Sequence, residues 1–134
     1  MTEVSDPRHE RRIQLMQTLF VLMFGEQFKV ESEKSTETVQ ETAELPYFKE
    51  AQAILAKSNE IDAQLVQHAP ERPLTEINQV DLAIMRLIVH EYQTSQTPKK
   101  VLIDEAIELA KEFGTDSSPK FVNGVLGKVL ELES

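Results

Sequence analysis

The sequence predicts an all-α fold of six to seven helices in two small packed bundles. Apolar residues recur every three to four positions through most of the chain, and no segment shows the alternation of a half-buried strand. Glycine is scarce, with four in 134 residues. A chain of this length is one domain. The proline-rich break at Pro70–Pro73 predicts a division into sub-bundles of about residues 1–72 and 73–134.

The first helix is predicted to begin at Asp6-Pro7. Aspartate is a favoured N-cap, and proline suits the first helical position because the N–H that it lacks has no helical partner there. A wide apolar face runs from Ile13 to Phe24, and we expect Gly25 to end the helix.

Cations gather at the start of this helix. A positive charge in the first turns opposes the helix dipole and costs about 0.3 kcal/mol or more. A bound anionic ligand therefore explains the cluster better than helix stability does, although a solvated charged end is the other interpretation. The residues concerned are Arg8, His9, Arg11 and Arg12.

The segment from residue 26 to residue 44 is polar and charged. It predicts a mobile loop followed by a short, weakly amphipathic helix near 36–44. A further helix follows Pro46, and another, capped by Asn59, ends before Pro70.

The most apolar helix is predicted over about Ile77–Tyr92. Its apolar residues lie nearly all round the helix, which is typical of an element buried on most sides. Arg86 falls within it, and a buried charge without a partner is strongly destabilising. We therefore expect Arg86 to contact an acid or a backbone carbonyl.

The C-terminal stretch predicts two helices joined by a short turn. The first has helically spaced apolar residues from Ile103 to Phe113, and Gly114 follows where a left-handed C-cap would lie. Ser118 and Pro119 predict the N-cap and first residue of the last helix, whose apolar stripe runs from Phe121 to Leu130.

The turn itself is a candidate anion site. The start of the last helix presents unpaired N–H groups and a partial positive charge, and Lys120 adds a full charge against the dipole. Ser117 supplies a hydroxyl, while Asp116 would repel a phosphate and could accept from a base edge. Phe121 has two interpretations, as a core residue or as a surface on which a base stacks.

Several segments of this half together resemble the NusB family of transcription antitermination factors. The resemblance covers about residues 72–130 well and residues 11–20 loosely, with no match between Gly25 and Pro46. The matching segments are Val80–Leu87, Glu91, Pro98, Lys100-Val101, Asp104–Lys111, Phe113-Gly114, Ser118, Lys120–Leu126 and Lys128.

The resemblance implies an RNA-binding function without a covalent step. NusB proteins bind the boxA element of ribosomal RNA leaders together with NusE, the small-subunit ribosomal protein. The pair joins the elongating RNA polymerase with other Nus factors and suppresses termination. In the family an arginine-rich first helix binds RNA, whereas this chain has three arginines there, interrupted by Glu10. The phenylalanine that matches Phe121 lies against RNA in the family.

The resemblance also implies a partner surface. The family uses an aromatic residue of the first helix and an acid at the start of the central helix, which match Phe20 and Asp81. Each residue has a simpler interpretation, because Phe20 lies on the apolar face of its helix and an acid is favoured by the dipole near a helix start.

Other classes of function have little support in the sequence. The three histidines are scattered, no E-x-x-H pair is present, and no glycine-rich phosphate loop occurs. We therefore expect neither an enzyme, nor a metal site, nor a cofactor. The absence of cysteine excludes disulfides, and the longest apolar run is far shorter than the roughly 20 residues of a membrane span. We expect a cytoplasmic protein with no membrane partner.

Charge supports a second candidate function. The net charge of −9 is unusual for a nucleic-acid-binding protein, and the arginine cluster is thin. The alternative is a helical protein-binding module that has lost RNA binding.

Overall fold

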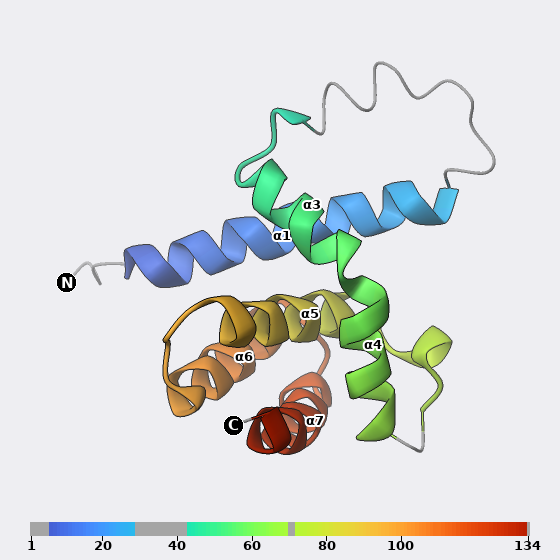
Figure 1. Cartoon of the computed structure of the whole chain (residues 1–134), viewed down its shortest axis with the longest axis vertical. Helices are drawn as coiled ribbons and strands as arrows, with labels where there is room; N and C mark the ends of the chain where they lie inside the picture. Colours follow the sequence, from blue (N-terminus) through green and yellow to red (C-terminus); the bar gives the residue numbers. More distant parts are fainter. Residues whose placement is uncertain (1–5, 29–42, 70–71, 134) are drawn as a thin grey trace. The chain divides into compact units, whose positions relative to one another are not determined.

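The structure is a computed structural model that describes residues 6–28, 43–69 and 72–133 (Figure 1). These residues form six α-helices and one short 3-10 helix, and no strand occurs among them. The all-α prediction is therefore confirmed. The predicted helix near 36–44 lies for the most part outside the described residues.

The chain divides into two compact units, residues 1–56 and 57–134. The boundary differs from the predicted one at about residue 72, because helix α4 (Ser58–Gln67) packs with the C-terminal helices. Helix α4 contacts α5, and an ion pair joins Asp62 of α4 to Arg86 of α5. These contacts place α4 in the second unit, although the proline-rich break follows it in the sequence.

The first unit contains α1 (Pro7–Phe28) and α3 (Phe48–Ala56), and α3 lies across α1 (Figure 1). The Thr18 hydroxyl donates to the Pro46 carbonyl at 2.7 Å and fixes the approach to α3. The prediction that Gly25 ends α1 is wrong. A glycine inside a helix costs only about 0.5–1 kcal/mol relative to alanine, which is too little to stop one. The buried apolar residues of this unit are Leu15, Met16, Leu19, Met23, Ala51 and Ile54.

The second unit is organised around α5 (Gln79–Thr94), which contacts α4, α6 (Lys99–Phe113) and α7 (Ser118–Glu133) (Figure 1). Every residue of α5 from Asp81 to His90 is buried, as its all-round apolar pattern predicts. The Asn78 side chain caps α5 by accepting from the Val80 amide at 2.8 Å.

The remaining segments of this unit differ in detail from the predictions. The 3-10 helix η1 (Leu74–Glu76) follows Pro73. Asn59 lies inside α4 and does not cap it, since the helix begins at Ser58. The position before Ser58 is held by Lys57, without a side-chain cap.

Candidate nucleic-acid interface

A groove of about 480 Å³ lies in the second unit, where the end of α4 and the segment after it meet the outer face of α7. Basic, small and aromatic side chains line it, and none of the described lining residues is acidic. This composition contrasts with the net charge of −9 of the whole chain. The lining residues are His68, Ala69, Arg72, Ser117, Lys120, Phe121, Gly124, Val125 and Lys128.

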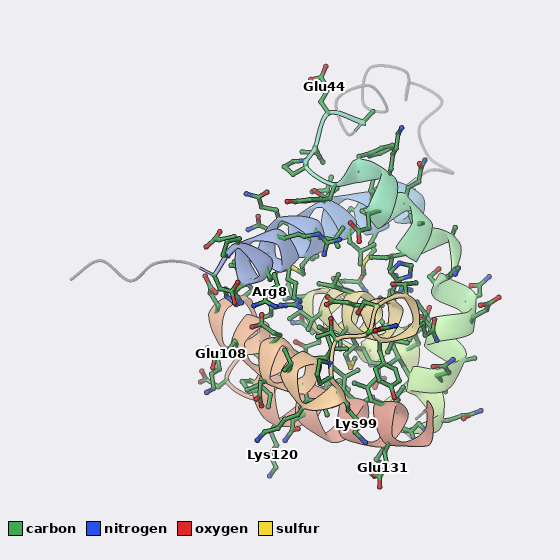
Figure 2. All side chains as sticks on the ribbon, turned by 60° about the vertical axis from the view of Figure 1, so that its left-hand side comes forward. Arg8, Glu44, Lys99, Glu108, Lys120 and Glu131 are labelled. Carbon is green, nitrogen blue, oxygen red and sulfur yellow. The ribbon has the colours of Figure 1, made fainter. Side chains whose placement is uncertain are left out.

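Helical spacing on α7 places one wall of the groove. Lys120, Gly124 and Lys128 follow one another at four-residue intervals and therefore share a face of the helix. Lys120 is exposed and projects away from α7 (Figure 2). Val125 is buried beside this stripe and anchors α7 to the unit. A Cβ atom on Gly124 would meet nothing within 4 Å, so the groove is open above this position.

Phe121 is neither a fully buried core residue nor an exposed one. Its side chain is half-buried, and the guanidinium carbon of Arg72 lies 4.4 Å from the centre of its ring. This distance is within the range of a cation–π contact. The structure thus brings an arginine from the segment after α4 onto an aromatic side chain of α7.

The turn before α7 is fixed by a close approach of Gly114 to Ser118. Gly114 is extended, with φ −94° and ψ −161°, so the predicted left-handed C-cap is wrong. A Cβ atom on Gly114 would lie 2.5 Å from the Ser118 Oγ and 2.8 Å from the Ala110 carbonyl oxygen. Glycine is required here by space.

Ser118 is fully buried and is the first helical residue, so its predicted place just outside the helix is also wrong. Its hydroxyl accepts from the Thr115 amide at 2.9 Å and so closes the turn. Asp116 and Ser117 remain exposed at the mouth of this turn, and Ser117 also lines the groove.

Asp81 lies behind this turn with 2% of its surface exposed. Burial raises the pKa of its carboxyl group, although hydrogen bonding by Ser118 and the charge of Arg72 act in the opposite direction. Its Oδ1 atom is buried with no hydrogen-bond partner. A buried carboxylate offers little surface to another protein, and the partner-binding role expected for Asp81 stays a prediction.

The N-terminal cations lie in the first unit and have different surroundings. The Arg8 side chain is 82% exposed, and its Nε lies 3.6 Å from Asp6 Oδ1. Arg11 forms an ion pair with Glu50 and lies 5.4 Å from the centre of the Tyr47 ring.

Arg12 is buried, with 5% of its surface exposed, and His9 is half-buried. Of the three arginines, Arg8 therefore has the most exposed side chain.

Comparison with known proteins identifies the family. The model of the NusB family matches residues 9–131. This chain belongs to the NusB family. A protein of Campylobacter concisus named "Transcription antitermination protein NusB" is 42% identical over 106 residues, which are 79% of this chain and 74% of the relative. A protein of the same name from Macrococcus caseolyticus is 32% identical over 126 residues, 92% of this chain and 96% of the relative.

A solved structure supports the same assignment. NusB of T. maritima superposes with a TM-score of 0.72 at 26% identity, covering 96% of this chain and 93% of that one. The fold described above is therefore the NusB fold.

Phe20, the other predicted partner residue of this NusB-family chain, is half-buried on α1. Its ring meets that of Phe24 edge to face, with the ring centres 4.8 Å apart. Val21 and Phe24 are 42% and 39% exposed, so apolar surface continues beside Phe20. Phe20 is thus not wholly a core residue.

The structure groups Ser117, Lys120 and Phe121 in one groove and places Asp116 in the adjoining turn, while their role in RNA binding stays a prediction. Sequence reasoning missed His68, Arg72 and Lys128. Lys128 could have been found, because it repeats the spacing of Lys120 on α7. Arg72 carries no such signal, since it lies outside any helix, within the proline-rich break.

Two classes of feature do not occur in the described part of the chain. No group of three histidine, aspartate or glutamate side chains is placed to hold a metal ion there. Within the same residues, no helix has both the length and the apolar character to cross a membrane.

Proposed function

We propose that this protein is an RNA-binding transcription antitermination factor. It binds boxA-type leader RNA of ribosomal RNA transcripts together with NusE, joins the RNA polymerase elongation complex with other Nus factors, and suppresses termination. This function consists of binding and involves no covalent step. The observation that carries the proposal is the basic groove beside α7, which holds Lys120, Lys128 and Phe121 in a chain of net charge −9.

The groove has the two kinds of group that single-stranded RNA requires. Lysine and arginine side chains neutralise phosphates, and an aromatic ring stacks on a base whatever its sequence. Lys120 and the Ser117 hydroxyl line the groove together and suit a phosphate, while the exposed Asp116 carboxylate suits a donor on a base edge. Phe121 contributes its aromatic ring to the stacking surface.

The cations of α1 form a second RNA-binding region in this proposal. Arg8 has a highly exposed side chain beside Asp6 and is accessible to a phosphate, whereas the ion pair of Arg11 with Glu50 is partly buried. His9 and Arg12 are less exposed than Arg8 and add hydrogen bonds or charge to this region. So small a set of cations on an acidic protein predicts weak RNA binding at physiological salt.

In this proposal, NusE binds to the protein and raises its affinity for RNA. The half-buried Phe20 and the exposed Val21 and Phe24 beside it form the candidate contact on α1. Asp81 was the second expected contact, and its burial makes an indirect role, through the turn at Ser118, the better proposal.

Fluorescence anisotropy with a labelled boxA-type RNA, with and without the cognate NusE, tests this function. We expect weak binding by the protein alone and tight binding when NusE is present. Binding of NusE without any effect on RNA affinity would favour the protein-binding module. Nanomolar RNA binding without NusE would contradict the electrostatic argument for partner dependence.

A further inference from the structure

We propose that Arg72 is a base-stacking residue of this groove. One unpaired base of single-stranded RNA stacks on the guanidinium that covers Phe121, and Lys120 and Lys128 bind phosphates along α7. The proposal rests on the RNA-binding function proposed above and adds the residues and the binding mode by which the groove takes its ligand.

The position of Arg72 carries the first step. Its guanidinium carbon is 4.4 Å from the centre of the Phe121 ring, and both side chains line the groove. A guanidinium is planar and weakly hydrated, and unstacked RNA bases stack on its plane as they do on aromatic rings. The Phe121 ring therefore supports Arg72 from one side, while the groove gives a base access to the pair.

The charges behind the pair favour this arrangement. Asp81 is buried in the same unit, and the positive charge of Arg72 acts on its carboxyl group through space. Because Asp81 is buried, it offers no negative surface to RNA.

The stripe on α7 defines a path for the RNA backbone. Lys120 and Lys128 are two helical turns apart, about 12 Å along the axis. Gly124 lies between them, and a Cβ atom there would meet nothing within 4 Å. Protein packing therefore does not require glycine at this position, and the missing side chain leaves room for an RNA backbone to approach α7.

The ligand class follows from these features. A base that stacks on a protein side chain must be unpaired, so the groove selects single strands over duplexes. Stacking on a guanidinium tolerates every base, so the sequence preference must come from other contacts.

The experiment uses fluorescence anisotropy of the full chain with NusE and a labelled single-stranded boxA-type RNA. Arg72→Lys keeps the charge and removes the planar stack, so RNA affinity should fall about tenfold with an unchanged salt dependence. Arg72→Gln should lose at least as much affinity and flatten the slope of log K against log salt by about 0.7. A duplex of the same sequence should compete poorly with the single strand.

Matched controls separate the groove from general charge effects. Gly124→Glu should weaken binding well beyond Gly127→Glu, because both add one acid to α7 at an open glycine and only Gly124 lines the groove. Lys100→Gln removes an exposed cation of the same unit outside the groove and should leave affinity nearly unchanged. Far-UV circular dichroism confirms that each variant is folded.

The outcomes distinguish the two proposals. If Lys120→Gln weakens binding while the Arg72 variants and Gly124→Glu do not, Arg72 is not a stacking residue and the RNA-binding function stands. If the unmodified protein fails to bind RNA with and without NusE, the proposed function and this binding mode are both overturned.

Discussion

The Arg86 guanidinium donates two hydrogen bonds to the Asp62 carboxylate, from Nε to Oδ1 at 2.9 Å and from Nη2 to Oδ2 at 2.6 Å. Both residues are buried, with 9% and 8% of their surfaces exposed. The pair joins α5 to α4 inside the second unit. It satisfies the requirement that a buried arginine has a partner, which the sequence of α5 predicts.

Removing one member of this pair should strongly destabilise the protein. Asp62→Ala leaves the Arg86 charge buried without compensation, so we expect the free energy of unfolding to fall by about 3–5 kcal/mol in urea titration. Glu108→Gln is the control, because it removes an exposed ion pair with Lys111 worth at most about 1 kcal/mol. Equal losses in the two variants would contradict this interpretation.

Gly114→Ala should destabilise the turn before α7. The added Cβ atom would lie 2.5 Å from the Ser118 Oγ and 2.8 Å from the Ala110 carbonyl oxygen, so the backbone must shift. We expect a loss of about 1–3 kcal/mol by thermal or urea unfolding. Gly127→Ala is the matched variant and should stabilise by about 0.5–1 kcal/mol, since it has open space and lies inside α7. A stabilising Gly114→Ala would show that the turn tolerates a side chain.

Phe121→Ala should affect RNA affinity more than stability. The ring is half-buried, so truncation should lower the free energy of unfolding by about 1–2 kcal/mol, including its contact with Arg72. Leu126→Ala, at a fully buried position of the same helix, should lose about 2–5 kcal/mol. RNA affinity of folded Phe121→Ala should fall about tenfold. Normal RNA binding by a much less stable Phe121→Ala protein would identify Phe121 as a core residue.

The stability contributed by Asp81 should depend on pH. Burial raises the pKa of its carboxyl group above the ordinary value of 3.8, so the folded state holds the proton more tightly than the unfolded state. This contribution is fully present below pH 3.8 and is lost as the pH rises through the higher folded pKa. Asp81→Asn cannot ionise, and should therefore melt at a higher temperature than the unmodified protein at pH 7.

The difference between the two proteins should shrink as the pH falls toward 4. Thermal unfolding followed by circular dichroism across this range measures it, with Asp116→Asn as an exposed control. A difference that is independent of pH would mean that ionisation of Asp81 does not control this effect.

Substitution of Arg8 should change RNA binding alone, whereas substitution of Arg11 should also change stability. Arg8→Gln removes an exposed cation, so RNA bound with NusE should show a salt slope lower by about 0.7, with little change in melting temperature. Arg11→Gln also removes the Glu50 ion pair and the contact with Tyr47, so the first unit should lose stability as well. If the RNA affinity and salt slope of Arg8→Gln are unchanged, Arg8 does not contact RNA and the start of α1 is only a solvated helix end.

The sequence by itself determined the all-α fold and the place of most helices. Helical spacing specifies which side chains share a face, so the burial of α5 followed from its local pattern. It could not fix helix ends within a residue or two, as Gly25 and Asn59 illustrate, because single residues shift the balance at an end by about 1 kcal/mol or less.

Only the tertiary structure decided which distant residues meet. The partner of Arg86 was required by its burial, but its identity as Asp62 depends on how α4 crosses α5. The contact of Arg72 with Phe121 and the burial of Asp81 likewise depend on where separate elements pack against α7. Periodicity orients side chains around one helix axis, whereas the packing of helices against each other is set by many apolar contacts that no single segment encodes.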